Sequence, residues 1–366
     1  MPAFSDADCG HMARALKLAS RGQYSAHPNP MVGCVIVNDG AVVGEGWHQR
    51  TGEAHAEINA LAAAGDKARG ATAYVTLEPC AHHGKTPPCA NALADAGIAQ
   101  VIAAVEDPFP EVAGRGLAAL KAAGIETEVG LMRAPAEMLN AGYIARITRG
   151  WPRVRVKVAA SIDGAIAMKS GESQWISGAE AREDVQHLRA RSGAILTGIG
   201  TVLADDPSLN VRLPSSTFSG LQPLRVVLDS DLRMPVRAAM LDLSGETLVC
   251  CVGQPDTGPL ERAGAEVRSF GDAGAKVDVS RVLAELAGRG VNDVLVEAGP
   301  GLTGHLLEQK LVDELVIYQA PHIMGSETRT MFQTPSWLRL ADRKSLEISD
   351  VRRFGDDTRI TARVLY

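Results

Sequence analysis

The feature that most constrains the fold is the alternation of strand-like and helical patterns over residues 1–149. After an opening helical pattern capped by Ser5 or Asp6, two apolar runs are joined at Asn38-Asp39-Gly40, a strong hairpin signal. The patterns then alternate in the order helix from 55, strand 72–79, helix 89–96, strand 100–108, helix 114–124 and helix 135–150. Strands connected through a helix pair in parallel. We therefore predict a three-layer α/β/α sandwich.

A second α/β region starts beyond Gly150 and Pro152, and the chain of 366 residues is long enough for two separate cores. We expect one domain over 1–149 and another over 150–366. Ser177 and Glu180 predict a capping box before a helix over 181–193. Strands are expected at 153–164, 194–200, 223–230, 246–253, 292–299 and 314–321, with an antiparallel hairpin over 344–366. This predicts a mostly parallel sheet with an antiparallel edge.

Composition excludes several classes of protein. The net charge of −6 and the aromatic content of 4% give neither the basic surface nor the stacking platforms that nucleic-acid binding uses. The sequence contains no run of about 18 apolar residues, which a membrane-spanning helix would need. The N-terminus has no signal-peptide pattern, so we expect a cytoplasmic protein whose six cysteines are reduced.

A metal-binding pattern lies in the first half. GEAHAEINALAAAG places His55 and Glu57 at the start of an alanine-rich helix, and Cys80 and Cys89 flank the loop of EPCAHHGKTPPC. One imidazole and two thiolates suit tetrahedral zinc, and three protein ligands leave the fourth position for water, as in catalytic sites. Glu57 is not expected to be a ligand and could transfer protons. HxE followed by PC matches the zinc deaminase signature. We predict a Zn²⁺ ion on His55, Cys80 and Cys89.

Other interpretations remain open at this point. The two cysteines could be inert buried thiols, and His82 or His83 could complete a closed, structural four-ligand site. The chain could also be a zinc deaminase that acts on nucleic acid, or a non-catalytic protein with a structural zinc. Eight residues separate Cys80 from Cys89, where the general deaminase signature has two.

The longer interval between the two cysteines is one of several features that resemble a known family, and the resemblance spans nearly the whole chain. PNPMVGCVIV, GEAHAEINAL and TLEPCAHHGKTPPCANAL resemble the deaminase half of the bifunctional riboflavin-biosynthesis deaminase-reductases. KVAASIDGAIAMKSGESQWIS, TGIGTVLADDPSLNVR and VEAGPGL resemble the reductase half. The resemblance implies a cytidine-deaminase-like domain followed by a dihydrofolate-reductase-like domain.

For the first domain, the resemblance implies hydrolytic removal of the 2-amino group of a diaminopyrimidinone ribosyl phosphate. The zinc ligands fall on His55, Cys80 and Cys89, and the proton shuttle falls on Glu57. Asn29, His48 and Lys85 would line the pyrimidine and phosphate pocket. The alternative is that Asn29 only forms a turn and that the other two are exposed polar residues.

For the second domain, the resemblance implies NADPH-dependent reduction at C1′ of the ring-opened ribose, giving a ribityl chain. Gly299, Gly301 and Gly304 form a GxGxxG pattern between a strand and a helix, where backbone N–H groups can meet a pyrophosphate. No acidic residue follows as the Rossmann fingerprint requires, which favours another dinucleotide fold.

The residues that the resemblance assigns in this domain fall into two sets. The cofactor contacts are Ala159, Trp175, Thr201, Asp205, Ser230, Gly299, Pro300, Gly301, Leu302, Thr303 and Gly304. The ribosyl phosphate contacts are Ser173, Arg189, Leu209, Arg212 and Glu297. Guanidinium groups bind phosphate bidentately, which fits the two arginines. Asp205 is a candidate proton donor. We expect a small-molecule enzyme that forms a homo-oligomer.

Overall fold

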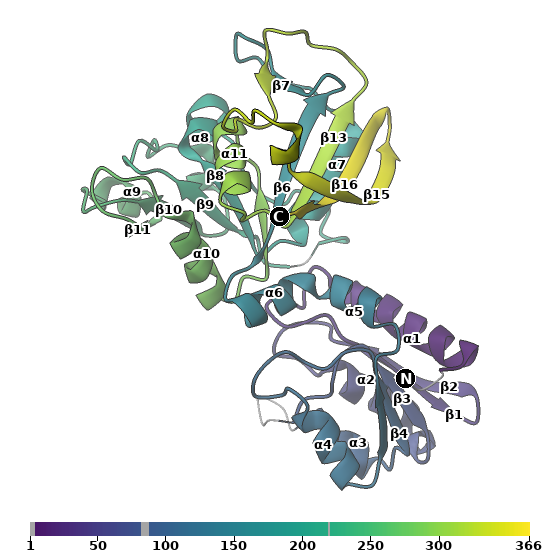
Figure 1. Ribbon diagram of the computed structural model, residues 1–366. Helices are drawn as coiled ribbons and strands as arrows, with labels where there is room; N and C mark the ends of the chain where they lie inside the picture. The colour runs from purple at the N-terminus through teal and green to yellow at the C-terminus, as the bar shows by residue number, and fades with distance from the viewer. Residues whose placement is uncertain (1–3, 82–87, 219) are drawn as a thin grey trace. The chain divides into compact units, whose positions relative to one another are not determined.

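The computed structural model describes residues 4–81, 88–218 and 220–366 (Figure 1). Two compact units divide the chain, Met1–Gly150 and Trp151–Tyr366. In the described part of the chain, no helix has the length and apolar character needed to cross a membrane.

The first unit is built on a five-stranded sheet in the order β2-β1-β3-β4-β5. Its strands are β1 (Gly33–Asn38), β2 (Ala41–Trp47), β3 (Thr72–Val75), β4 (Gln100–Ala103) and β5 (Glu126–Val129). The hairpin predicted at Asn38-Asp39-Gly40 joins β1 to β2. β3 and β4 are parallel, as predicted for strands connected through a helix, and β5 continues the parallel order.

Helices cover both faces of this sheet (Figure 1). They are α1 (Asp6–Ala19), α2 (Ala56–Ala64), α3 (Cys89–Asp95), α4 (Arg115–Ala122), α5 (Arg133–Leu139) and α6 (Ala141–Arg149), with 3-10 turns η1 (Ser20–Gly22) and η2 (Gly65–Ala68). Cys34, Ile36 and Val75 pack toward α2, α3 and α4, while Val35 and Tyr74 pack toward α1, α5 and α6. The predicted three layers are therefore confirmed.

Two details of this unit differ from the predictions. The helix expected over 135–150 is two helices, because Asn140 leaves the helical path and its amide holds the backbone of Met31: Oδ1 accepts from Met31 N and Nδ2 donates to Met31 O, both at 2.8 Å. β5 was not predicted because its sequence, ETEV, is an edge strand without a buried residue and so has no apolar run.

The second unit is built on a nine-stranded sheet in the order β11-β10-β9-β8-β12-β6-β13-β16-β15. Its strands are β6 (Arg153–Ser161), β8 (Ala194–Gly198), β9 (Leu224–Leu228), β10 (Thr247–Cys251), β11 (Glu266–Ser269), β12 (Asp293–Val296), β13 (Glu314–Ala320), β15 (Ser345–Phe354) and β16 (Asp357–Leu365). β7 (Ala165–Ala167) and β14 (Arg329–Thr330) form a separate pair. The first seven strands of the order are parallel and the last two antiparallel, as predicted.

Helices also cover both faces of the large sheet (Figure 1). They are α7 (Ala179–Ala190), α8 (Ile199–Asp205), α9 (Gly258–Arg262), α10 (Val279–Gly288) and α11 (Pro300–Glu308), with η3 (Ala239–Asp242) and η4 (Leu340–Asp342). Leu196 and Val226 face the core with α10 and α11. Their neighbours Ile195 and Val227 face the opposite core with α8 and α9.

Two local predictions in this unit were wrong. The capping box of Ser177 and Glu180 does not form: α7 begins after Gly178, whose N–H donates to Asp357 Oδ2 at 2.7 Å. A tertiary acceptor on β16 thus replaces the local cap. The strand expected over 194–200 ends at Gly198, and α8 begins at Ile199.

Candidate functional site

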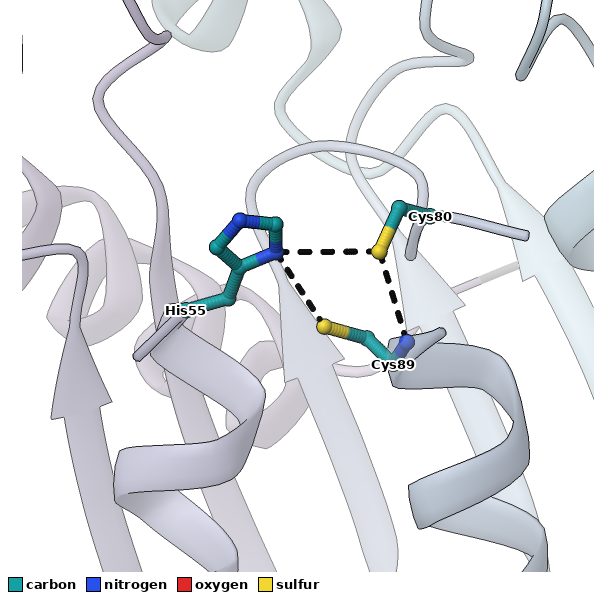
Figure 2. Close-up of side chains that lie close together, drawn as sticks. All are labelled: His55, Cys80 and Cys89. Carbon is teal, nitrogen blue, oxygen red and sulfur yellow. Dashed lines mark hydrogen bonds between the residues drawn. The ribbon is translucent and has the colours of Figure 1, made fainter. Parts of the chain in front are cut away.

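The predicted metal ligands meet at the ends of two helices in the first unit (Figure 2). His55 is the N-cap residue of α2, Cys80 lies in the segment after β3, and Cys89 is the first residue of α3. The His55 Nδ1 atom lies 3.6 Å from Cys80 Sγ and 3.3 Å from Cys89 Sγ, and all three ligand atoms lie within 4.8 Å of one another. Residues 25 and 34 positions apart are thus brought to one point.

These separations fit zinc. Zn–N of about 2.0–2.1 Å and Zn–S of about 2.3 Å at a tetrahedral angle put nitrogen and sulfur ligands about 3.6 Å apart. The two observed nitrogen-to-sulfur distances, 3.6 and 3.3 Å, are close to that value. The donor set of one imidazole and two thiols is also one that zinc prefers over magnesium or calcium.

The surroundings of the two thiols favour a bound cation. A hydrogen bond with the Cys89 side chain lowers the pKa of the Cys80 thiol to about 4. The hydrogen bond with His55 and the Cys89 backbone N–H, which donates to the same sulfur at 3.3 Å, act in the same direction. The hydrogen bond to the Cys80 thiolate and burial raise the pKa of Cys89. A second thiolate at this position therefore requires a positive charge beside it, which a dication provides.

Glu57 lies in the first turn of α2 and is 3% exposed. Burial and the neighbouring Cys80 thiolate raise the pKa of Glu57 to about 7. A carboxyl group whose pKa is near neutrality can accept a proton and return it. The ligand geometry does not need this side chain, which leaves it available for proton transfer.

Asn29 and His48, both predicted to line the substrate pocket, form a pair beside His55. Asn29 Nδ2 lies 3.1 Å from His48 Nε2, and His48 Nδ1 lies 3.2 Å from the Ala54 carbonyl. A carbonyl can only accept, so Nδ1 carries the proton and Nε2 accepts from the Asn29 amide. Burial lowers the pKa of His48, which favours the neutral ring. The His48 and His55 rings meet edge to face with centroids 5.4 Å apart.

Lys85, His82 and His83 lie outside the described residues. The predicted phosphate contact of Lys85 and the alternative of a closed four-ligand site therefore have no structural description.

The residues predicted for the second unit gather at one edge of its sheet. Carboxyl ends of parallel strands share an edge, where ligands bind in open α/β sheets. Ala159 lies near the end of β6, Ser230 follows β9, and Glu297 follows β12. Thr201 and Asp205 lie on α8, which follows β8 directly.

Arg189 and Glu297 form a buried ion pair at this edge. The guanidinium binds the carboxylate bidentately, with Nε–Oε1 at 2.6 Å and Nη2–Oε2 at 3.0 Å. Its third nitrogen donates to the Asn210 carbonyl at 3.0 Å, and Arg212 donates to the Asn210 side chain at 2.9 Å. The neighbouring Leu209 is 2% exposed and has a positive φ of 44°.

Lys157 is a charged residue of this group that the sequence did not indicate. It lies on β6 two residues before Ala159, on the same face. Burial lowers the pKa of Lys157, while the charge of Glu297 opposes that effect. Its position within an apolar strand was the available signal, because a lysine at an inward strand position needs a partner or a ligand.

The glycine loop has the predicted strand-to-helix setting. Gly299 is the N-cap residue of α11, and among the described residues no atom beyond its neighbours in the chain lies within 4 Å of the place where a Cβ would be. A Cβ on Gly304 would lie 2.0 Å from the Gln333 carbonyl, so this glycine is needed for packing. Thr303 is fully buried, and its hydroxyl lies 3.1–3.3 Å from three backbone carbonyls. Pro300, Gly301 and Leu302 complete the first turn.

Ser173 and Trp175 lie in the segment between β7 and α7. The Trp175 side chain is 70% exposed, and the Arg182 guanidinium lies over its ring at 4.6 Å from the centroid. An exposed indole held by a cation presents a flat apolar face to a ligand.

Comparison with known proteins accounts for both units. Residues 5–105 match the cytidine and deoxycytidylate deaminase zinc-binding region, and residues 152–359 match the RibD C-terminal domain. The riboflavin biosynthesis protein RibD of Escherichia coli is 47% identical over 95% of this chain and 96% of its own length. The chain belongs to the RibD family. RibD of Bacillus amyloliquefaciens is 40% identical over 96% of this chain and 95% of its own length.

Solved RibD structures agree. RibD of Acinetobacter baumannii is 43% identical with a TM-score of 0.91, covering 98% of this chain and 99% of that one. A diaminohydroxyphosphoribosylaminopyrimidine deaminase/5-amino-6-(5-phosphoribosylamino)uracil reductase from Thermotoga maritima is 30% identical with a TM-score of 0.87 over the same shares.

The chain is thus a bifunctional deaminase and reductase of riboflavin biosynthesis, with zinc on His55, Cys80 and Cys89 and an NADPH-dependent reductase domain. The predicted cytidine-deaminase-like and dihydrofolate-reductase-like domains are confirmed. This assignment replaces the alternatives of a nucleic-acid deaminase and of a non-catalytic zinc protein.

Proposed function

We propose that the first unit removes the 2-amino group of 2,5-diamino-6-ribosylamino-4(3H)-pyrimidinone 5′-phosphate, with Glu57 as the proton carrier. Bound zinc supplies a Lewis acid and brings the pKa of its water to about 7. Glu57 accepts a proton as the water oxygen bonds to C2. It then donates a proton to the departing nitrogen, so that ammonia leaves when the C2–N bond breaks.

The Asn29–His48 pair orients the pyrimidine in this proposal. The Asn29 Nδ2 group donates to His48, and its Oδ1 atom, an acceptor, is proposed to accept from an N–H group of the ring. Because the pair lies beside the metal ligand His55, it reaches the same substrate that the metal site does. Lys85 is proposed to bind the phosphate.

The second unit is proposed to reduce 5-amino-6-(5-phosphoribosylamino)uracil, the name that the Thermotoga maritima relative carries for its reductase substrate. Lys157, Arg189 and Arg212 set three positive charges against the single carboxylate of Glu297. The excess of positive charge suits a phosphate, which carries about −1.5 to −2 at neutral pH. Ser173 and Leu209 complete the ribosyl phosphate contacts.

NADPH is proposed to lie along the carboxyl edge of the sheet and to supply the hydride to C1′. Its contacts are Ala159, Trp175, Thr201, Asp205, Ser230 and the loop from Gly299 to Gly304, where the open space at Gly299 lets a pyrophosphate approach the start of α11. In the ring-opened form C1′ is doubly bonded to the amino nitrogen, and Asp205 is the proposed donor of the proton that this nitrogen takes as the hydride adds to C1′.

The observation that carries the proposal is the His55, Cys80 and Cys89 cluster with Glu57 buried beside it. The test supplies the intact chain with the diaminopyrimidinone substrate and NADPH, and follows ammonia and NADPH separately. Ammonia release should need zinc but not NADPH, and NADPH oxidation should follow it. Ammonia release that persists after zinc removal would contradict the proposal.

A homo-oligomer in the cytoplasm is proposed as the working form. The edge strand β15 exposes Leu346, Ile348 and Val351 by 43%, 60% and 58%. A bulge at Ser349 keeps all three on the face that carries the buried Ala362 of β16. An apolar edge strand invites pairing with another strand, and a second copy of this chain is the proposed cover. Ile348→Lys should reduce the mass in light scattering.

A further inference from the structure

We propose that Glu78 is a positioning residue for the metal ligand Cys80. Glu78 stands two residues before Cys80, directly after β3, and is 4% exposed. The sequence patterns of zinc ligation and proton transfer do not include it. A buried carboxylate at this place needs an explanation, because ionised groups are costly to bury without partners.

The partners of Glu78 are backbone N–H groups of one segment. Oε2 accepts from Asp107 N at 3.1 Å and from Gly114 N at 2.9 Å. Oε1 accepts from Gly116 N at 2.9 Å and from Leu117 N at 3.2 Å. All four donors lie between β4 and the first turn of α4, so one side chain ties the segment before Cys80 to residues 107–117.

The chain between Glu78 and Cys80 is also held by direct contact. A Cβ on Gly116 would lie 1.9 Å from the Pro79 carbonyl oxygen, so the first turn of α4 packs against Pro79 itself. The Glu78 N–H donates to the Val105 carbonyl at 2.9 Å. The backbone immediately before Cys80 is therefore fixed on both sides.

The other side of Cys80 is held by α3. Ala90 N donates to the Cys80 carbonyl at 3.2 Å, and Cys89 N donates to the Cys80 sulfur at 3.3 Å. The two attachments, through Glu78 and through α3, together hold the Cys80 sulfur 3.6 Å from His55 Nδ1. If the attachment through Glu78 is removed, the sulfur can move away from the position that zinc requires.

Glu78→Gln tests this role, because it keeps the size of the side chain but turns one acceptor into an NH₂ group facing two N–H donors. Loss of groups that orient metal ligands typically weakens metal affinity about 10–100-fold. We expect a change in that range for the full chain, measured as zinc transfer to a chromogenic chelator. Glu126→Gln, an exposed site in the same unit, is the matched control and should release zinc at the wild-type rate.

Two further readouts separate positioning from general damage. Excess zinc should restore most of the ammonia release by Glu78→Gln, and NADPH oxidation with the deaminated substrate should stay at the wild-type rate. If the variant does not fold, Glu78→Asp, which keeps the charge, is measured in the same way. Wild-type zinc affinity in the folded variant, or lost ammonia release with zinc fully retained, would overturn the proposal. The zinc measurement does not depend on the proposed substrate.

Discussion

Changing Glu57 to Gln removes the proposed proton carrier and leaves the metal ligands in place. Glu57 is 3% exposed, so an isosteric amide fills the same space, and the three ligand atoms belong to other residues. Zinc content should stay unchanged. A general acid/base typically contributes about 10²–10⁴-fold, so the barrier to deamination should rise by about 3–5 kcal/mol.

The assay uses the intact variant and follows ammonia release from the diaminopyrimidinone and NADPH oxidation with the already deaminated substrate. Only the first rate should fall, because Glu57 and the reductase residues belong to different units. Glu53→Gln, an exposed carboxylate four residues earlier, is the control. Ammonia release within a few-fold of the wild-type rate, with zinc bound, would refute the role of Glu57.

Three further predictions concern residues that hold other parts of the two sites. Asn140→Ala leaves the backbone N–H and carbonyl of Met31 without their hydrogen-bond partners, which should lower the free energy of unfolding by about 1–3 kcal/mol in thermal melts. Because Met31 follows the proposed substrate contact Asn29 by two residues, the KM of deamination should rise as well. Arg189→Lys loses the bidentate contact with Glu297 that orients the guanidinium, and with it the proposed hydrogen bond to the phosphate. The reductase KM should rise about 10–100-fold, since a hydrogen bond to a charged group contributes about 1.5–3 kcal/mol; an unchanged KM would contradict the phosphate assignment. Burial raises the pKa of Glu297, but the charge of Arg189 outweighs burial and holds the pKa below its usual value of about 4.3. The ionised Glu297 therefore stabilises the fold above that pH, and this stabilisation is lost as the pH falls through the lower pKa of the folded state. Glu297→Gln should lose less unfolding free energy than the wild type on acidification, measured in denaturant titrations.

The zinc ligands could be predicted from the sequence because the type of each residue and its near neighbours in the chain already indicate metal binding. A histidine before a helix, a cysteine after a buried strand and another cysteine at a helix start have only a few ways to meet once β3 and β4 are parallel. The layers followed from the same alternation of strands and helices. These features depend on residue type and spacing, which a single sequence displays.

The errors concern tertiary partners, which spacing does not display. Asn140 splits a helix because Met31, more than 100 positions away, offers both of its backbone groups. The capping box predicted at Ser177 does not form, because α7 has Gly178 as its N-cap residue and the Gly178 N–H donates to Asp357. Lys157 and Glu78 were missed because their importance comes from groups that arrive from other strands and loops.

The most direct test of the zinc site is the coordination of the metal in the purified intact chain, measured as zinc content together with X-ray absorption at the zinc edge. We expect one zinc per chain bound by one nitrogen and two sulfur atoms of the protein, with an oxygen atom of solvent in the fourth position. A chain without zinc, or a zinc whose four positions are all filled by side chains, would contradict it.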